Sequence, residues 1–152
     1  MKPTLFLSGP ITGLSYNEVV AWRDMVRAEL QSCGIICFSP MRGFKEWLGG
    51  ETKIKESYQE NPSGTDAAIT DQDYFDVARC DVLMVNLLNT KEISKGTLFE
   101  IAWAYQLRKP LILVIEKQGN VHEHPMVRRA ATYRVDTVAD GIAIAKRLLL
   151  PD

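Results

Sequence analysis

The chain has 152 residues, a length typical of one domain that buries a full hydrophobic core. With 46% hydrophobic residues, 24% charged residues and a formal charge of −1, the composition is globular and excludes the basic surface of a general nucleic-acid binder. The apolar runs at 82–85 and 111–115 are too short for a membrane span. The three cysteines are odd in number and lack metal-site spacing, so we expect one cytoplasmic domain over residues 1–152.

Short apolar runs alternate with amphipathic stretches along almost the whole chain. Ser15 and Glu18 form a capping-box pattern that starts the first helix, and Gly34 ends it. In chain order, the expected elements are strand 4–7, helix 15–33, strand 35–38, helix 66–80, strand 82–87, helix 96–108, strand 111–115, strand 133–135 and helix 137–149.

This alternation of strands and helices predicts an α/β fold. Because the middle strands are apolar on both faces, we expect a parallel sheet with helices on both sides. The pattern favours a flavodoxin-like (Rossmann-like) sheet of five parallel strands. Such sheets bind ligands beyond the C-terminal ends of their strands, where the strand order reverses. A site is therefore expected among residues 8–14, 39–70 and 86–97.

Two stretches interrupt the alternation. Residues 49–66 hold only Ile54 and Tyr58 as sizeable apolar residues, and so long a loop without secondary structure is uncommon in a compact domain. A substrate lid over residues 42–66 and a plain surface insertion are both consistent with this pattern. Residues 117–131 are too irregular for an ordinary helical crossover.

Glu100 is the one charged residue in the stretch 97–105 and lies in the first turn of its expected helix. Its neighbours are apolar on all sides, so we expect the helix to be buried and Glu100 with it. A buried carboxylate is costly unless it is paired or has a function. The alternative is a capping-box glutamate that reaches back to the start of the helix.

Asp73 shares the apolar face of its expected helix with Val77, whereas Asp71 and Asp76 are expected to be surface acids. An acid at the start of the helix, capped by Thr70, is the competing interpretation. Two carboxylates at the mouth of a sheet suit glycosyl chemistry, in which one acts as nucleophile and the other handles a proton.

Other candidate contacts lie in turns. Residues 8–13 contain glycines that allow a ligand close to the backbone, but they match neither a P-loop nor a dinucleotide motif. Residues 94–97 can hold an anion at a helix N-terminus or form a simple turn and cap. Arg42 follows the second strand and is a candidate ligand contact. His122 and His124 lack further ligands at metal-site spacing, so we expect no metal.

Three stretches in this order resemble the nucleoside 2-deoxyribosyltransferase family, and most of all its branch that hydrolyses the N-glycosidic bond of nucleoside 5′-monophosphates. They are Ser8-Gly9-Pro10-Ile11, Gln72-Asp73 followed by residues 78–82, and Ser94-Lys95-Gly96-Thr97-Leu98-Phe99-Glu100 with residues 101–104. The resemblance runs from the first strand to the last helix. It implies that Glu100 attacks C1′ and forms a covalent glycosyl-enzyme, and that Asp73 helps to protonate the leaving base.

The same resemblance bears on the 5′ group of the substrate. Six residues before the nucleophile, the transferases carry an Asp that holds the sugar 5′-hydroxyl, whereas this chain has Ser94, as the hydrolases do. A hydroxyl and nearby N–H groups can donate to a phosphate that a carboxylate would repel. The hydrolases complete the phosphate site from a neighbouring subunit, in a region that His124 and Met126 match. The resemblance therefore implies a homodimer with shared sites.

Phe6 stands where many members have a Tyr near the 2′ side of the sugar, which leaves both deoxyribonucleotides and ribonucleotides such as CMP open as substrates. The resemblance predicts release of free base and a 5-phosphosugar, without metal or organic cofactor and without a nucleic-acid or membrane partner. The alternatives are a deoxyribosyltransferase that exchanges bases on deoxynucleosides and a nucleotide-sensing module without turnover. Besides Glu100 and Asp73, the expected substrate contacts are Phe6, Ser8, Gly9, Pro10, Ile11, Arg42, Ser94, Gly96, Thr97, His124 and Met126.

Overall fold

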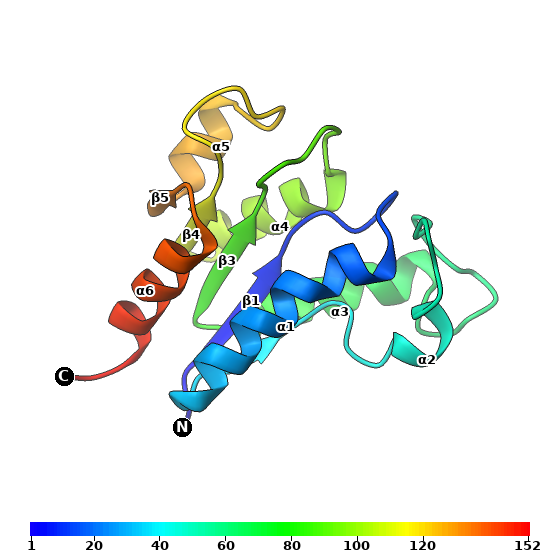
Figure 1. Cartoon of the computed structure of the whole chain (residues 1–152), viewed down its shortest axis with the longest axis horizontal. Coiled ribbons are helices and arrows are strands. Elements are labelled where there is room, and N and C mark those ends of the chain that lie inside the picture. Colours follow the sequence, from blue (N-terminus) through cyan, green and yellow to red (C-terminus); the bar gives the residue numbers. More distant parts are fainter.

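Five strands form one sheet in the computed structural model, which describes residues 1–152 of the chain. The order across the sheet is β2-β1-β3-β4-β5, and every neighbouring pair is parallel (Figure 1). The strands are β1 (Thr4–Ser8), β2 (Ile36–Phe38), β3 (Val82–Asn86), β4 (Leu111–Val114) and β5 (Tyr133–Val135). The predicted flavodoxin-like α/β fold is confirmed.

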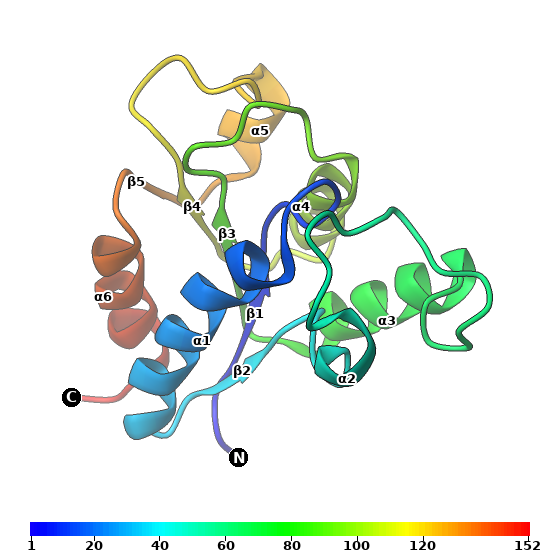
Figure 2. The ribbon, with the colours of Figure 1, turned by 45° about the vertical axis from the view of Figure 1, so that its right-hand side comes forward.

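Six helices complete the fold, and all but the short α2 cover the two faces of the sheet (Figure 2). They are α1 (Tyr16–Ser32), α2 (Lys45–Leu48), α3 (Asp66–Arg79), α4 (Lys95–Gln106), α5 (Pro125–Ala130) and α6 (Val138–Leu149). Helices α1 and α6 pack on one face, whereas α3, α4 and α5 pack on the other. None of the helices combines the length and the apolar character needed to span a bilayer.

Strand β1 shows why the central strands are apolar at successive positions. Leu5 and Leu7 belong to the core under α1 and α6, whereas Phe6 between them belongs to the core under α3 and α4. All three side chains are fully buried. Because neighbouring side chains of a strand point to opposite faces, a sheet covered on both sides needs apolar residues at every position of its central strands.

The helices begin at capping residues. Ser15 and Glu18 exchange the side-chain and backbone hydrogen bonds of the predicted capping box. Thr65 caps α3, so this helix begins at Asp66 and carries Asp73 in its middle. The interpretation of Asp73 as a helix-start acid capped by Thr70 is therefore wrong.

The segment between β2 and α3 packs against the rest of the domain. Leu48, Ile54 and Tyr58 form a third buried cluster with Val19 of α1. Backbone hydrogen bonds also join Ile54 to Gly13 and to Leu14. This segment therefore lies beside the turn that follows β1, which brings its residues to the C-terminal edge of the sheet.

Helix α4 is buried on one side only. Glu100, Ile101 and Ala104 face the interior, whereas Phe99 is 60% exposed and Tyr105 is 40% exposed. The expectation that this helix is buried on all sides is therefore wrong. Its sequence is apolar all round, but a single chain covers only half of it.

Candidate active site

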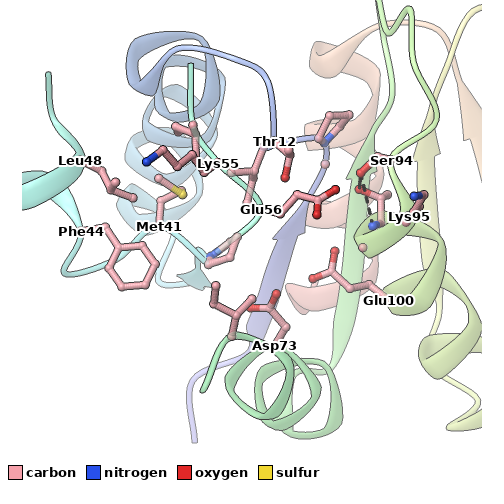
Figure 3. Close-up of a pocket in the computed structure, with 18 of the residues that line it drawn as sticks. Thr12, Met41, Phe44, Leu48, Lys55, Glu56, Asp73, Ser94, Lys95 and Glu100 are labelled. Atoms are coloured by element: carbon pink, nitrogen blue, oxygen red, sulfur yellow. Dashed lines mark hydrogen bonds between the residues drawn. The ribbon is translucent and has the colours of Figure 1, made fainter. Parts of the chain in front are cut away.

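A cavity of about 570 Å³ opens beyond the C-terminal ends of β1 and β3, where the strand order reverses (Figure 3). This volume is in the usual range for small-molecule sites. All three segments in which a site was expected contribute to its walls. Residues 9–12 come from the turn after β1, residues 40–58 from the segment around α2, and residues 92–97 from the loop before α4 and its first turn.

Glu100 lies at the inner wall of this cavity, and its side chain comes from the second turn of α4. It is 6% exposed, and Ser8 at the end of β1 donates a hydrogen bond from Oγ to its Oε1 at 2.7 Å. Ser94 and not Glu100 makes the capping contact of α4, through the backbone N–H of Thr97. The capping-box alternative for Glu100 is therefore wrong, and capping does not explain why the Glu100 side chain is buried.

Asp73 faces Glu100 from the neighbouring helix α3. Figure 3 shows the carboxyl groups of both residues pointing into the cavity. Burial raises the pKa of Glu100, and the negative charge of Asp73 raises it further. Burial likewise raises the pKa of Asp73, together with the charge of Asp76. Two interacting carboxyl groups with raised pKa values hold one proton between them over a wide pH range.

The environments of the two carboxyl groups differ. Ser8 donates a hydrogen bond to Glu100, which lowers the pKa of this carboxyl and favours its ionised form. The charge of Asp76, on the same helix as Asp73, raises the pKa of Asp73 and also raises that of Glu100. As a pair that shares one proton, Glu100 and Asp73 provide one carboxylate and one proton donor on one cavity, the combination needed to attack an anomeric carbon and protonate a leaving group.

The first turn of α4 forms the end of the cavity away from Asp73 (Figure 3). Ser94, Lys95, Gly96 and Thr97 all line it. A Cβ atom added to Gly96 would meet nothing within 4 Å, so the backbone there is open. The N–H groups of the first helical turn have no partners within the helix, and they favour an anion together with the helix dipole. Ser94 caps the helix and also lines the cavity, so the interpretation of residues 94–97 as a turn and cap is confirmed, and the anion site stays a prediction.

The sequence did not predict a role beside the cavity for two residues, His122 and Glu56. His122 is buried, and its Nε2 accepts a hydrogen bond from the backbone N of Ser94 at 2.8 Å. Its Nδ1 then carries the hydrogen and lies 3.0 Å from Oδ1 of Asn120, so the ring is neutral. Burial lowers the pKa of His122, in agreement with this state. Glu56 adds a third carboxylate that points into the cavity (Figure 3).

Several predicted contacts lie outside the cavity. Phe6 is fully buried in the core, and Ser8 is buried behind Glu100, through which alone it reaches the cavity. His124 and Met126 start α5 and do not line the cavity of their own chain. By contrast, Gly9, Pro10 and Ile11 do line it, with Gly96 and Thr97.

Arg42 does not line the cavity either. Its guanidinium binds both oxygens of Asp76, which is fully buried and also pairs with Arg79. The expectation that Asp76 is a surface acid is therefore wrong, and Arg42 has a structural partner in place of the expected ligand. A buried carboxylate needs such cations because its desolvation is costly.

The raised pKa of Glu100 predicts a pH-dependent stability. In the unfolded chain this carboxyl titrates near its ordinary value, so between the two pKa values the folded state binds more protons and stability falls as pH rises. Glu100→Gln removes this loss, and we expect its gain in free energy of unfolding over the parent chain to grow by about 2 kcal/mol from pH 4 to pH 8. Urea unfolding at both pH values measures it. Glu29→Gln, on the surface of α1, should show no such growth, and equal pH profiles for Glu100→Gln and the parent would contradict the expectation.

Fold and cavity together define a flavodoxin-like α/β protein whose cavity contains two interacting carboxyl groups. The family model described as nucleoside 2-deoxyribosyltransferase matches residues 5–144, and the chain belongs to this family. The resemblance seen in the sequence is thereby confirmed. No curated protein sequence shows a significant match.

Three solved structures with the same fold belong to differently named proteins. The CMP N-glycosidase BcmB from Clostridium botulinum has a TM-score of 0.59 and 15% identity over 96% of this chain and 99% of that one. A 2-desoxiribosyltransferase from Leishmania mexicana has a TM-score of 0.52 and 18% identity over 74% of this chain, which spans 64% of that protein. The Moco carrier protein from Chlamydomonas reinhardtii has a TM-score of 0.60 and 20% identity, with 98% of both chains covered. At these identities the likeness shows the fold alone.

Proposed function

We propose that this protein hydrolyses the N-glycosidic bond of a nucleoside 5′-monophosphate and releases free base and a 5-phosphosugar. The observation that carries the proposal is the meeting of Glu100 and Asp73 in one cavity that ends at the open first turn of α4. Membership of the family supports an enzyme that acts on the bond between a sugar and a base.

In the proposed reaction, the Glu100 carboxylate attacks C1′ of the sugar. The C1′–N bond breaks, its electron pair goes to the base, and Asp73 donates the proton that the base needs to leave. A water molecule then attacks C1′ of the glycosyl ester and gives a proton to Asp73, which frees the Glu100 carboxylate. Two displacements on the same carbon retain its configuration.

The cavity also offers distinct surroundings for the two ends of the substrate. Near Asp73, the cavity wall is apolar and partly aromatic, and it suits a planar base; it consists of Met41, Phe44, Trp47, Leu48, Tyr58 and Ile69. At the other end, the N–H groups of Lys95 and Gly96 with the Ser94 hydroxyl suit the 5′-phosphate. His122 supports this end because it holds the backbone of Ser94.

The proposal is tested by incubating the protein with common ribonucleoside and deoxyribonucleoside 5′-monophosphates and with the matching nucleosides, and by measuring released base by chromatography. We expect release from at least one monophosphate and far slower release from its nucleoside. A second free base in the reaction separates hydrolysis from transfer: exchange on nucleosides without phosphate dependence would establish a deoxyribosyltransferase. Tight nucleotide binding without any base release would establish a binding module.

We further propose that two copies of the chain form a homodimer in which His124 and Met126 of one subunit complete the phosphate end of the other's cavity. The exposed side of α4 supports this assembly. Phe99 stacks edge-on against Trp103, which contacts Tyr74 of α3 in the same way, and Met126 at the start of neighbouring α5 is 77% exposed. An apolar surface across neighbouring helices is typical of an interface.

Replacing Phe99 by Lys is expected to break the dimer, because the substitution buries an unpaired charge at the proposed interface. Light scattering after size-exclusion chromatography should give twice the chain mass for the parent and the single chain mass for the variant, together with a loss of base release. Met25→Lys, which also replaces an exposed apolar side chain but on α1 across the sheet, should remain dimeric. A monomeric parent protein at assay concentration would overturn the shared-site proposal.

A further inference from the structure

Arg23 of α1 is a buried cation for which the proposed reaction has assigned no role. It is 1% exposed and does not line the cavity. Its guanidinium donates to three backbone carbonyl oxygens: Nε to Leu7 at 3.2 Å, Nη2 to Gly9 at 2.9 Å and Nη1 to Val19 at 2.6 Å. No carboxylate forms an ion pair with it.

Two of these carbonyl groups lie on either side of Ser8. Arg23 therefore fixes the backbone around the residue whose hydroxyl donates to Glu100. The backbone is closely packed at this point, because a Cβ atom on Gly9 would lie 2.8 Å from the carbonyl oxygen of Asn86 and also close to Trp22 and Arg23. The guanidinium also stacks on the Trp22 ring, 4.6 Å from its centroid. Few other positions are open to the Ser8 hydroxyl.

The charge of Arg23 acts on the same carboxyl group. It lowers the pKa values of both Glu100 and Asp73, against the burial that raises them. Burial lowers the pKa of Arg23 itself to about 10, which leaves the guanidinium charged at neutral pH. A buried charge without a contacting counter-ion is costly, and an apolar side chain would fill the space at less cost. The cost points to a role at the cavity.

We propose that Arg23 is a positioning residue for the nucleophile: it binds the carbonyl groups on both sides of Ser8, which sets the Ser8 hydroxyl on Oε1 of Glu100, and it supplies the counter-charge of the Glu100 carboxylate. The link through Ser8 orients one oxygen of Glu100 and leaves the other for C1′. The kinetic consequence rests on the proposed function, whereas the effect on Glu100 is independent of it.

The first test is the titration of Glu100 without substrate, by carboxyl carbon NMR. Arg23→Gln keeps a hydrogen-bond donor but removes the charge, and it should move the titration of Glu100 to higher pH. Arg23→Lys keeps the charge but loses the fork of donors, and it should move this titration less. Arg27→Lys, exposed on the same helix and paired with Asp24, is the control and should leave it unchanged. An unchanged titration in folded Arg23→Gln would overturn the electrostatic part.

The second test is kinetic. Arg23→Lys should lower kcat by about 10²-fold with little change in KM, because the nucleophile is misplaced while the cavity walls remain. Ser8→Ala should cost a similar factor, and the double variant should cost no more than the larger single loss, since both act through one hydrogen bond. Additive losses, or a rise in KM at constant kcat, would overturn the positioning role. If wild-type protein releases no base, the proposed function fails and the titration still decides the inference.

Arg23→Gln and Arg23→Lys both replace a fully buried side chain, so the folding of these two variants is checked by circular dichroism. Should neither variant fold, the Nε–H resonance of Arg23 in the unaltered chain takes the place of the first test. Its chemical shift should follow the titration of Glu100 and lose this step in Glu100→Gln. A resonance that does not change with the ionisation of Glu100 would overturn the proposal.

Discussion

Base release falls by about 10³-fold or more when Glu100 is replaced by Gln, if this carboxylate is the nucleophile. Glutamine has nearly the same shape and can still accept the hydrogen bond from Ser8, so the cavity should keep its form. It cannot form the glycosyl ester, because an amide oxygen is a far poorer nucleophile than a carboxylate. Rates of base release from the preferred monophosphate, at saturating substrate and pH 7, measure the effect.

The control for this prediction is Glu29→Gln, which removes a surface carboxylate paired with Lys146 and should keep full activity. Circular dichroism and nucleotide binding should show that Glu100→Gln remains folded and retains its ligand. Substantial turnover by the folded variant would remove Glu100 from the nucleophilic role.

Asp73→Asn is expected to lower kcat by about 10²- to 10³-fold, because an amide cannot hand a proton to the leaving base. The loss should depend on the base. Nucleotides whose base leaves readily as an anion need little protonation, so the variant should approach the parent rate with them. Comparison of kcat across a series of bases with different acidity measures this dependence.

The neighbouring acid Asp71 provides a matched control. It lies on the same helix α3 but is exposed, and Asp71→Asn should retain the activity of the parent chain. An Asp73→Asn loss that is the same for every base would mean that Asp73 positions the substrate and does not protonate it.

The alternation of apolar residues along the chain was enough to predict the fold. Leu5, Phe6 and Leu7 are apolar in succession because both faces of β1 are covered, and this feature distinguishes a parallel sheet between helices from an open one. The apolar sequence around Glu100 misled in one respect. Periodicity reports that a surface is apolar, but it does not say whether the same chain or another copy covers it, and Phe99 is exposed in the single chain.

The candidate site was partly accessible from the sequence. Glu100 and Asp73 stood out because each is a single acid on an apolar helix face, and the structure brings both to one cavity. Arg42 and Asp76 were misplaced because their pairing joins residues 34 positions apart, which no local pattern reports. Arg23 was missed for a similar reason: its partners are backbone carbonyl groups, which leave no trace in the sequence.

The shared fold does not decide among the possible functions. An N-glycosidase, a transferase and a carrier protein have TM-scores of 0.52 to 0.60 to this chain, so the sheet and its helices serve different tasks. What distinguishes the functions here is the pair of carboxyl groups. A protein that only binds an anionic ligand gains nothing from two acids in its cavity, whereas the proposed reaction, which attacks carbon and protonates a base, requires them.

The covalent step is the centre of this account, and mass spectrometry of the rapidly quenched reaction tests it most directly. During turnover of a nucleoside 5′-monophosphate, the parent chain should gain the mass of the phosphosugar less one water, on the peptide that contains Glu100, and Glu100→Gln should not gain it. Base release at the full rate without any such adduct, together with a product of inverted configuration at C1′, would show that water attacks the sugar directly and would contradict the account.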